Sequence, residues 1–274
     1  MLVFPNCKVN LGLQVLQKRS DGYHDIATVF YPVPLKDVLE IVPPENTQQL
    51  TINNYGLPVN GDTADNLCVK AWHLLKKDAP DLPFVQIHLL KNIPMGAGLG
   101  GGSADGAFML QLLNNKFHLE LKGQQLIQYA LQLGSDCPFF VVNKPCYATG
   151  RGELMETIDL DLSGYQLVMV NPGIHVNTGW AFERLNISGA LTKNMVVKEV
   201  IMQPVSEWKY QLLNDFEQPV FKEYPEIKYI KENLYTLGAE YASMSGSGSI
   251  VFGLFNKDIN LTSGLPAHYT VIQL

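Results

Sequence analysis

Residues 94–104 form a glycine-rich segment that could bind a phosphate group, since five of the eleven residues are glycine. Glycine adopts positive φ without strain and lets a ligand approach the backbone closely. Residues 85–89 before it alternate apolar and polar side chains as a strand does, and apolar residues after it recur at helical spacing. The glycines therefore lead into a helix N-terminus, where unpaired N–H groups and the helix dipole attract phosphate.

The composition of this loop fits other ligand-binding motifs only in part. Residues 96–101 also match G-x-G-x-x-G, and Glu120 lies about 20 residues farther on, where a ribose-binding acid of a dinucleotide site is expected. The segment around Glu120 is too polar to end a buried strand, however. The chain lacks G-x-x-x-x-G-K-[ST], which excludes a P-loop, and lacks H-R-D and D-F-G, which excludes a protein kinase. A loop without a ligand stays open as an alternative.

Three charged or polar residues outside the loop are candidates for chemistry. Lys8 and Asn10 are two residues apart, so on a strand they share one face while Val9 lies on the other. Asp136 stands between a glycine and an apolar run, at the edge of a core, where a general base could lie. The alternatives are a solvated edge strand for the first pair and a cap or turn for Asp136.

The segment Asp21-Gly22-Tyr23-His24 predicts a tight hairpin that presents an aromatic ring beside an imidazole. Such a pair could bind a flat ligand. A plain hairpin with two surface side chains is the alternative.

Composition restricts the class of protein. The chain is 46% hydrophobic and 17% charged, which is ordinary for a globular protein, and its net charge of −6 argues against nucleic-acid binding. No apolar run approaches the roughly 20 residues of a membrane span. The first residues do not resemble an export signal, and the four cysteines form no C-x-x-C pair, so we expect a reducing, cytoplasmic setting. H-E-x-x-H is absent, and a transition-metal site built by the protein is not expected.

The order of elements predicts an α+β protein of two domains, with a boundary near residues 150–160. Strands dominate the first ninety residues, and helices and strands then follow in separate groups. We expect helices at 66–77, 123–133, 215–222 and 225–236, and strands at 84–91, 138–142, 165–173, 240–244, 249–255 and 269–273.

Taken together, these segments resemble the GHMP small-molecule kinases. The resemblance runs from residue 4 to about 255 and rests on the glycine loop, Lys8, Asp136 and a second glycine-rich segment, 244–249. Four segments resemble one branch of this family in particular: Lys8-Val9-Asn10, Asp21-Gly22-Tyr23-His24, residues 134–140 and Asn214-Asp215-Phe216-Glu217. The resemblance implies that the protein phosphorylates a hydroxyl of a cytidine-diphosphate substrate in isoprenoid precursor synthesis. Cys7 and Cys137 depart from the alanine and the aliphatic residue that are usual there.

The resemblance implies a fold and a division of the chain. Residues 1–155 would form an ATP-binding domain like ribosomal protein S5, and residues 156–274 a ferredoxin-like domain. The active site would lie in the cleft between them.

The resemblance also implies roles for individual residues. ATP would donate the phosphoryl group, with Mg²⁺ near the Ser103 hydroxyl. Asp136 would accept the proton of the substrate hydroxyl, and Lys8 would stabilise the negative charges around it. Asn10 would hold the substrate or Lys8. Tyr23, His24 and Phe182 would bind the cytosine ring, with Trp180 as a second candidate on the same helix. The ATP phosphates would bind Pro94, Met95, Gly96, Ala97, Gly98, Leu99, Gly100, Gly101, Gly102, Ser103 and Ala104.

Two other functions stay open at this point. The first is another GHMP-type kinase, acting on homoserine or mevalonate. The second is a non-catalytic nucleotide-binding protein, which the presence of both Lys8 and Asp136 disfavours. Neither nucleic acid nor a membrane is expected as a partner, and we expect a monomer or a homodimer.

Overall fold

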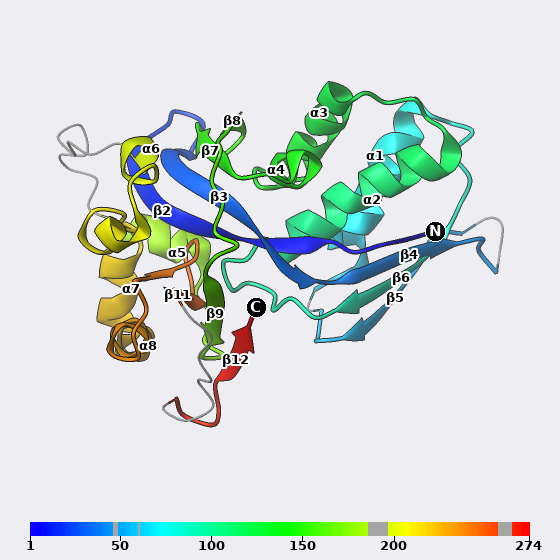
Figure 1. The fold of residues 1–274 in the computed structure, drawn as a ribbon. Helices are drawn as coiled ribbons and strands as arrows, with labels where there is room; N and C mark the ends of the chain where they lie inside the picture. Colours follow the sequence, from blue (N-terminus) through cyan, green and yellow to red (C-terminus); the bar gives the residue numbers. More distant parts are fainter. Residues whose placement is uncertain (46–48, 60, 186–196, 257–264) are drawn as a thin grey trace. The chain divides into compact units, whose positions relative to one another are not determined.

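The chain folds into two compact units that are each assembled from separate stretches of sequence (Figure 1). A computed structural model describes residues 1–45, 49–59, 61–185, 197–256 and 265–274. Unit 1 contains Met1–Lys8, Pro32–Met95 and Gly100–Lys144, and unit 2 contains Val9–Tyr31, Gly96–Leu99 and Pro145–Leu274. The mixture of helices and sheets confirms the α+β class.

Unit 1 combines a sheet with a group of helices. The sheet has the order β1-β4-β6-β5, in which β5 runs parallel to β6 and the other pairs are antiparallel. Its strands are β1 (Leu2–Val3), β4 (Val38–Val42), β5 (Thr51–Gly56) and β6 (Gln86–Lys91). The 3₁₀ helix η1 (Thr63–Asp65) precedes the helices, which are α1 (Leu67–Asp78), α2 (Gly101–Phe117), α3 (Gly123–Leu133) and α4 (Cys137–Val142).

The helices of unit 1 begin in different ways. The Asn66 side chain caps α1 by accepting the N–H of Cys68 at 2.9 Å. Helix α2 begins after Gly100, which has a left-handed φ of 70° and no side chain that could cap. The N–H groups of the first turn of α2 are therefore not used by a cap, as the sequence predicted for a phosphate-binding helix.

The predicted strand at 138–142 is wrong, because these residues form helix α4. Pro138 lies at the start of this helix, where its fixed φ is favourable and its missing N–H costs nothing. A short run in which every residue is apolar has no visible period, so the sequence alone could not separate strand from helix.

Unit 2 contains a sheet of order β10-β11-β9-β12 with antiparallel pairs throughout. Its strands are β9 (Gln166–Asn171), β10 (Tyr241–Met244), β11 (Val251–Phe255) and β12 (Thr270–Gln273), which confirm the predictions for those segments. Its helices are α5 (Thr178–Glu183), α6 (Val197–Val200), α7 (Glu217–Glu223) and α8 (Pro225–Thr236), with the 3₁₀ helix η3 (Val205–Tyr210).

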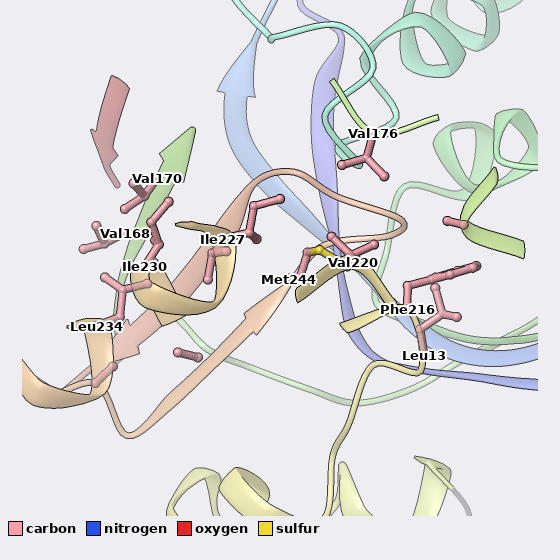
Figure 2. Packing of buried hydrophobic residues seen from close by; sticks show 14 of the residues in the cluster. Leu13, Val168, Val170, Val176, Phe216, Val220, Ile227, Ile230, Leu234 and Met244 are labelled. Atoms are coloured by element: carbon pink, nitrogen blue, oxygen red, sulfur yellow. The ribbon is translucent and has the colours of Figure 1, made fainter. Parts of the chain in front are cut away.

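The core of unit 2 lies between this sheet and its helices (Figure 2). Val168 and Val170 of β9 and Met244 of β10 are fully buried, and so are Val220 of α7 and Ile230 of α8. Helices α7 and α8 thus cover the sheet with apolar side chains, and this burial is the main source of stability.

A third sheet has the order β2-β3-β7-β8 and consists of β2 (Asn6–Lys18), β3 (His24–Lys36), β7 (Cys146–Thr149) and β8 (Leu154–Thr157). The turn between β2 and β3 confirms the predicted hairpin. Gly22 has a φ of 86° there, and the Asp21 carboxylate accepts the N–H of Tyr23 at 3.1 Å. Along the described part of the chain, no helix combines the length and the apolar character that crossing a bilayer requires.

Candidate active site

The structure brings Lys8 and Asp136 together, and both belong to unit 1. Lys8 Nζ lies 3.6 Å from Asp136 Oδ2, with the lysine side chain 4% exposed and the aspartate side chain 35% exposed. Asp136 occupies the N-cap position of α4, yet its side chain makes no capping hydrogen bond. The carboxylate is therefore not a helix cap. It faces a buried ammonium and is still accessible to a substrate hydroxyl.

Gly100 lets this pair approach the start of α2. A Cβ on Gly100 would lie 3.2 Å from Lys8 Cε and 3.1 Å from the Phe140 ring, so these side chains would have to shift by a few tenths of an ångström. In the first turn of α2, the Ser103 hydroxyl hydrogen bonds to the Cys137 thiol, next to Asp136. A cation, a carboxylate, a hydroxyl and an uncapped helix start thus come together within unit 1.

The two glycine-rich segments contact each other inside unit 2. Gly98 has a φ of 83°, and a Cβ there would overlap the Ser245 carbonyl oxygen, so only glycine fits. The Ser245 hydroxyl donates to the Gly98 carbonyl oxygen at 2.8 Å and accepts the Asn10 N–H at 3.3 Å. The second segment therefore supports the first.

The Asn-Asp-Phe-Glu segment holds the second glycine-rich segment in place. Asn214 Nδ2 donates to the carbonyl oxygens of Met244 and Gly246 at 2.7 and 2.8 Å. Glu217 accepts the Met244 N–H at 2.9 Å and pairs with Lys231 at 2.6 Å. The sequence singled out this segment only by resemblance, and the structure gives it a supporting function.

Asn10 is buried, and the Asn10 amide donates to the Thr28 hydroxyl at 3.0 Å. This bond ties β2 to β3 within unit 2. The role of Asn10 toward substrate or Lys8 stays a prediction.

The hairpin places Tyr23 and His24 in different surroundings. Tyr23 is 53% exposed, and the Arg151 guanidinium lies 4.5 Å from the centre of its ring. Glu153 in turn pairs with the Arg151 guanidinium at 3.7 Å. Sequence reasoning did not find Arg151. The sequence shows only that Arg151 lies in a turn at residues 150–153, and a turn does not reveal which aromatic ring the arginine contacts.

His24 stacks on Phe182, as the prediction of a shared ring site requires. Their ring centres are 4.5 Å apart with planes inclined by 11°. The Phe182 and Phe216 ring centres are 4.8 Å apart with planes nearly perpendicular. Burial, and secondarily the positive charge of Lys18, lowers the pKa of His24, so its imidazole is neutral at pH 7. The Trp180 ring centre instead lies 5.9 Å from that of Tyr224, although Trp180 and Phe182 both pack against the core of unit 2. The geometry favours Phe182 over Trp180 as a ligand-facing ring.

The two cysteines beside the candidate site are not reactive thiols. Cys7 and Cys137 are fully buried, and burial raises the pKa of each to about 12. Reactive cysteines are exposed and have a lowered pKa. Both therefore act as small packing residues.

A buried ion cluster lies at the base of the glycine loop, and sequence reasoning missed it. Lys91 Nζ donates to Asp37 and, at 2.6 Å, to Asp105, and all three side chains are almost completely buried in unit 1. We call these residues the loop-base cluster. A signal was present, because Lys91 shares the inward face of β6 with Ile87 and Leu89.

Asp105 makes stability depend on pH. Burial, opposed by Lys91 and reinforced by Asp37, raises the pKa of Asp105 to about 8. At pH values between the ordinary aspartate pKa and about 8, the Asp105 carboxyl is ionised in the unfolded chain but still protonated in the folded chain. Unfolding then releases a proton, and stability falls as pH rises through this window.

We therefore expect Asp105→Asn to raise the melting temperature relative to the parent protein, more at pH 8 than at pH 5. An amide keeps the shape and avoids the buried charge. The gain should reach at least about 2–4 °C at pH 8, the shift that ~1 kcal/mol gives in a protein of this size. Thermal melts at both pH values, with the exposed Asp161→Asn as control, measure it. Parallel pH profiles for parent and variant would contradict the assignment.

The described residues contain no group of three or more His, Cys, Asp or Glu side chains that could hold a metal ion. Mg²⁺ needs no such group, since it is often bound through one or two oxygen ligands together with substrate phosphates. The Ser103 hydroxyl and the Asp136 carboxylate are oxygen donors of that kind.

Comparison with known proteins identifies the family. The description "GHMP kinases N terminal domain" matches residues 66–144, and "GHMP kinases C terminal" matches residues 204–266. A 4-diphosphocytidyl-2-C-methyl-D-erythritol kinase from Bacteroides fragilis is 51% identical over 96% of this chain and 94% of its own length. The chain belongs to the GHMP kinases, in the branch of the 4-diphosphocytidyl-2-C-methyl-D-erythritol kinases.

Solved structures support the same conclusion for this GHMP kinase. A crystal structure of 4-(cytidine 5'-diphospho)-2C-methyl-D-erythritol kinase aligns with a TM-score of 0.76 and 31% identity, covering 93% of this chain and 90% of that one. The mevalonate kinase of Methanococcus jannaschii aligns with a TM-score of 0.70 but only 12% identity, over 93% of this chain and 90% of that one. The second likeness shows the shared fold alone.

Proposed function

We propose that this GHMP kinase transfers the γ-phosphoryl group of ATP to the 2-hydroxyl of 4-diphosphocytidyl-2-C-methyl-D-erythritol. The observation that supports phosphoryl transfer is the separation of 3.6 Å between Lys8 Nζ and Asp136 Oδ2, beside the start of α2. The acceptor is inferred from the relative that carries this name at 51% identity over nearly the full length.

The glycine loop binds the phosphates of ATP in this proposal. The uncapped start of α2 offers N–H groups and the positive end of a 17-residue helix. Ser103 would hold Mg²⁺ together with the phosphate oxygens. When bound, Mg²⁺ neutralises charge that builds up on the transferred group.

Asp136 and Lys8 carry out the proton and charge chemistry. The acceptor oxygen forms a bond to the γ-phosphorus while the bond from that phosphorus to the ADP oxygen breaks. Asp136 takes the proton of the acceptor hydroxyl. Lys8 stabilises the negative charge that develops on the attacking oxygen and on the phosphoryl group.

Three aromatic side chains of unit 2, those of Tyr23, His24 and Phe182, bind the cytosine in this proposal. Tyr23 offers an exposed face for stacking, while neutral His24 and Phe182 complete an aromatic surface. Arg151 occupies one face of the Tyr23 ring, so a base stacks on the other. The location of the active site between the two domains stays a prediction.

Tyr23→Ala is expected to weaken the cytidyl substrate by roughly tenfold to a hundredfold, since stacking contributes about 1–3 kcal/mol per base. The KM for ATP should stay almost unchanged. The assay follows ADP release while one substrate is varied at a time, with Tyr55→Ala as control because Tyr55 is similarly exposed and lies on β5 of unit 1. A higher KM for ATP with an unaffected acceptor KM would assign the hairpin to the nucleotide donor.

A panel of acceptors with Mg²⁺ and ATP tests the proposed reaction directly. The cytidyl acceptor should be phosphorylated, and homoserine and mevalonate should not. Turnover of mevalonate or homoserine in its place would favour the other GHMP kinases. ATP binding without turnover of any acceptor would favour a non-catalytic nucleotide-binding protein.

We also propose a domain boundary near residue 155 and a cytoplasmic location. The family matches end at residue 144 and resume at residue 204, which leaves room for that boundary. The four cysteines are buried and form no disulfide in the described part of the chain, which suits a reducing compartment.

A further inference from the structure

The loop-base cluster joins the two ends of the glycine loop. Asp37 Oδ1 accepts the N–H groups of Asn92 and Ile93, at 2.6 and 2.9 Å, just before the loop begins at Pro94. Lys91 lies one residue earlier, and its ammonium bonds to Asp105 in the second turn of α2, just after the loop ends. One buried network therefore holds the entry and the exit of the loop.

Lys91 also lies directly beneath the first residue of α2. A Cβ on Gly101 would lie 3.5 Å from Lys91 Nζ and 2.8 Å from Ile93 Cγ2. The first turn of α2 thus rests on the lysine head group and on the segment that Asp37 binds. A change in this network would shift the helix start and, with it, the direction of its N–H groups.

The network is costly to bury, which argues that it is not a simple stabilising contact. Two aspartate side chains share one ammonium, all three side chains are at most 4% exposed, and Asp105 Oδ1 is buried without a hydrogen-bond partner among the described residues. Such buried ion groups often add little stability compared with apolar residues of similar volume. They do fix geometry, because each charged hydrogen bond has a preferred length and direction.

We propose that Asp37, Lys91 and Asp105 are positioning residues for ATP: they set the geometry of the glycine loop, and with it the affinity for ATP but not for the acceptor. This inference rests on the proposed function, since it requires that the loop binds ATP. None of the three side chains needs to touch the nucleotide.

The test replaces the network without leaving a buried charge unpaired. In Asp37→Asn/Lys91→Met/Asp105→Leu, apolar side chains replace the Lys91–Asp105 pair, and the amide at position 37 still offers an oxygen acceptor to the N–H groups of Asn92 and Ile93. The single substitution Asp37→Asn is the second network variant. It keeps an oxygen acceptor for the N–H groups of Asn92 and Ile93 but removes the negative charge that faces Lys91. Leu113→Ala, a fully buried change farther along α2, supplies a variant of reduced stability outside the network.

We expect both network variants to raise the KM for ATP about tenfold or more, as a small misplacement of binding groups does. Their KM for the acceptor should stay within about twofold of the parent value, which separates a positioning effect from a general loss of folded enzyme. Calorimetric titration with Mg²⁺-ATP should show the same loss of affinity. Asp105→Asn should restore near-parent values, because the amide accepts the Lys91 hydrogen bond.

Two results would overturn the inference. One is an unchanged KM for ATP in both network variants. The other is a rise in both substrate constants like that of Leu113→Ala at equal melting temperature. Failure of the parent protein itself to bind Mg²⁺-ATP is a different outcome, which would overturn the proposed function and this inference with it.

Discussion

Asp136→Asn is expected to remove most of the turnover while both substrates still bind. The substitution keeps the shape of the side chain and removes the base that accepts the hydroxyl proton. General-base catalysis contributes about 10²–10⁴-fold, so kcat should fall by that order. An interaction made in the transition state lowers kcat and leaves substrate binding nearly intact.

Steady-state kinetics and calorimetric titration of each substrate measure these two effects separately. Asp62→Asn is a matched control, since Asp62 also occupies an N-cap position in unit 1 but caps its helix by accepting the Ala64 N–H. Asparagine caps as well as aspartate, and this control should keep the parent kcat. Lys8→Met should resemble Asp136→Asn, because it removes the cation 3.6 Å away. Near-parent kcat in either variant would show that the pair does not carry the chemistry.

Gly102→Val is expected to abolish most ATP binding in a protein that stays folded. Gly102 is in the first turn of α2, and a Cβ there would meet no other atom within 4 Å, so the fold has room for the side chain. The added methyl groups would occupy the space where a phosphate must approach the N–H groups. We expect a loss of roughly a hundredfold in ATP affinity, comparable with a ~1 Å misplacement in an active site.

The neighbouring Gly101 shows why the position matters. From the sequence alone, Gly101 and Gly102 are equivalent. In the structure a Cβ on Gly101 would lie 2.8 Å from Ile93 Cγ2, so Gly101→Val should destabilise unit 1 rather than test the phosphate site. Gly123→Val is the matched control, because Gly123 opens α3 with similarly free space. Circular dichroism checks folding, and unchanged ATP affinity in folded Gly102→Val would move the phosphate site elsewhere.

The sequence by itself determined the features that are local. The glycine loop between strand β6 and helix α2, the Asp-Gly hairpin and the strands of unit 2 were all predicted from spacing and turn residues. Each depends on neighbours in the chain: positive φ at Gly98 and Gly22, or alternation along a strand. The identity of the acceptor came from resemblance and not from any such pattern.

The tertiary structure decided what distant residues do to one another. Residues 138–142 form a helix, which their short and uniformly apolar sequence did not reveal. Asp136 faces Lys8 rather than capping α4, and Phe182 rather than Trp180 faces His24. The loop-base cluster joins Asp37, which precedes β4, Lys91, the last residue of β6, and Asp105 of α2. Its members are 54 and 14 positions apart in the chain, and no local pattern encodes a hydrogen bond across such separations. Asp37, Lys91 and Asp105 come into contact only when the strands and helix of unit 1 pack together.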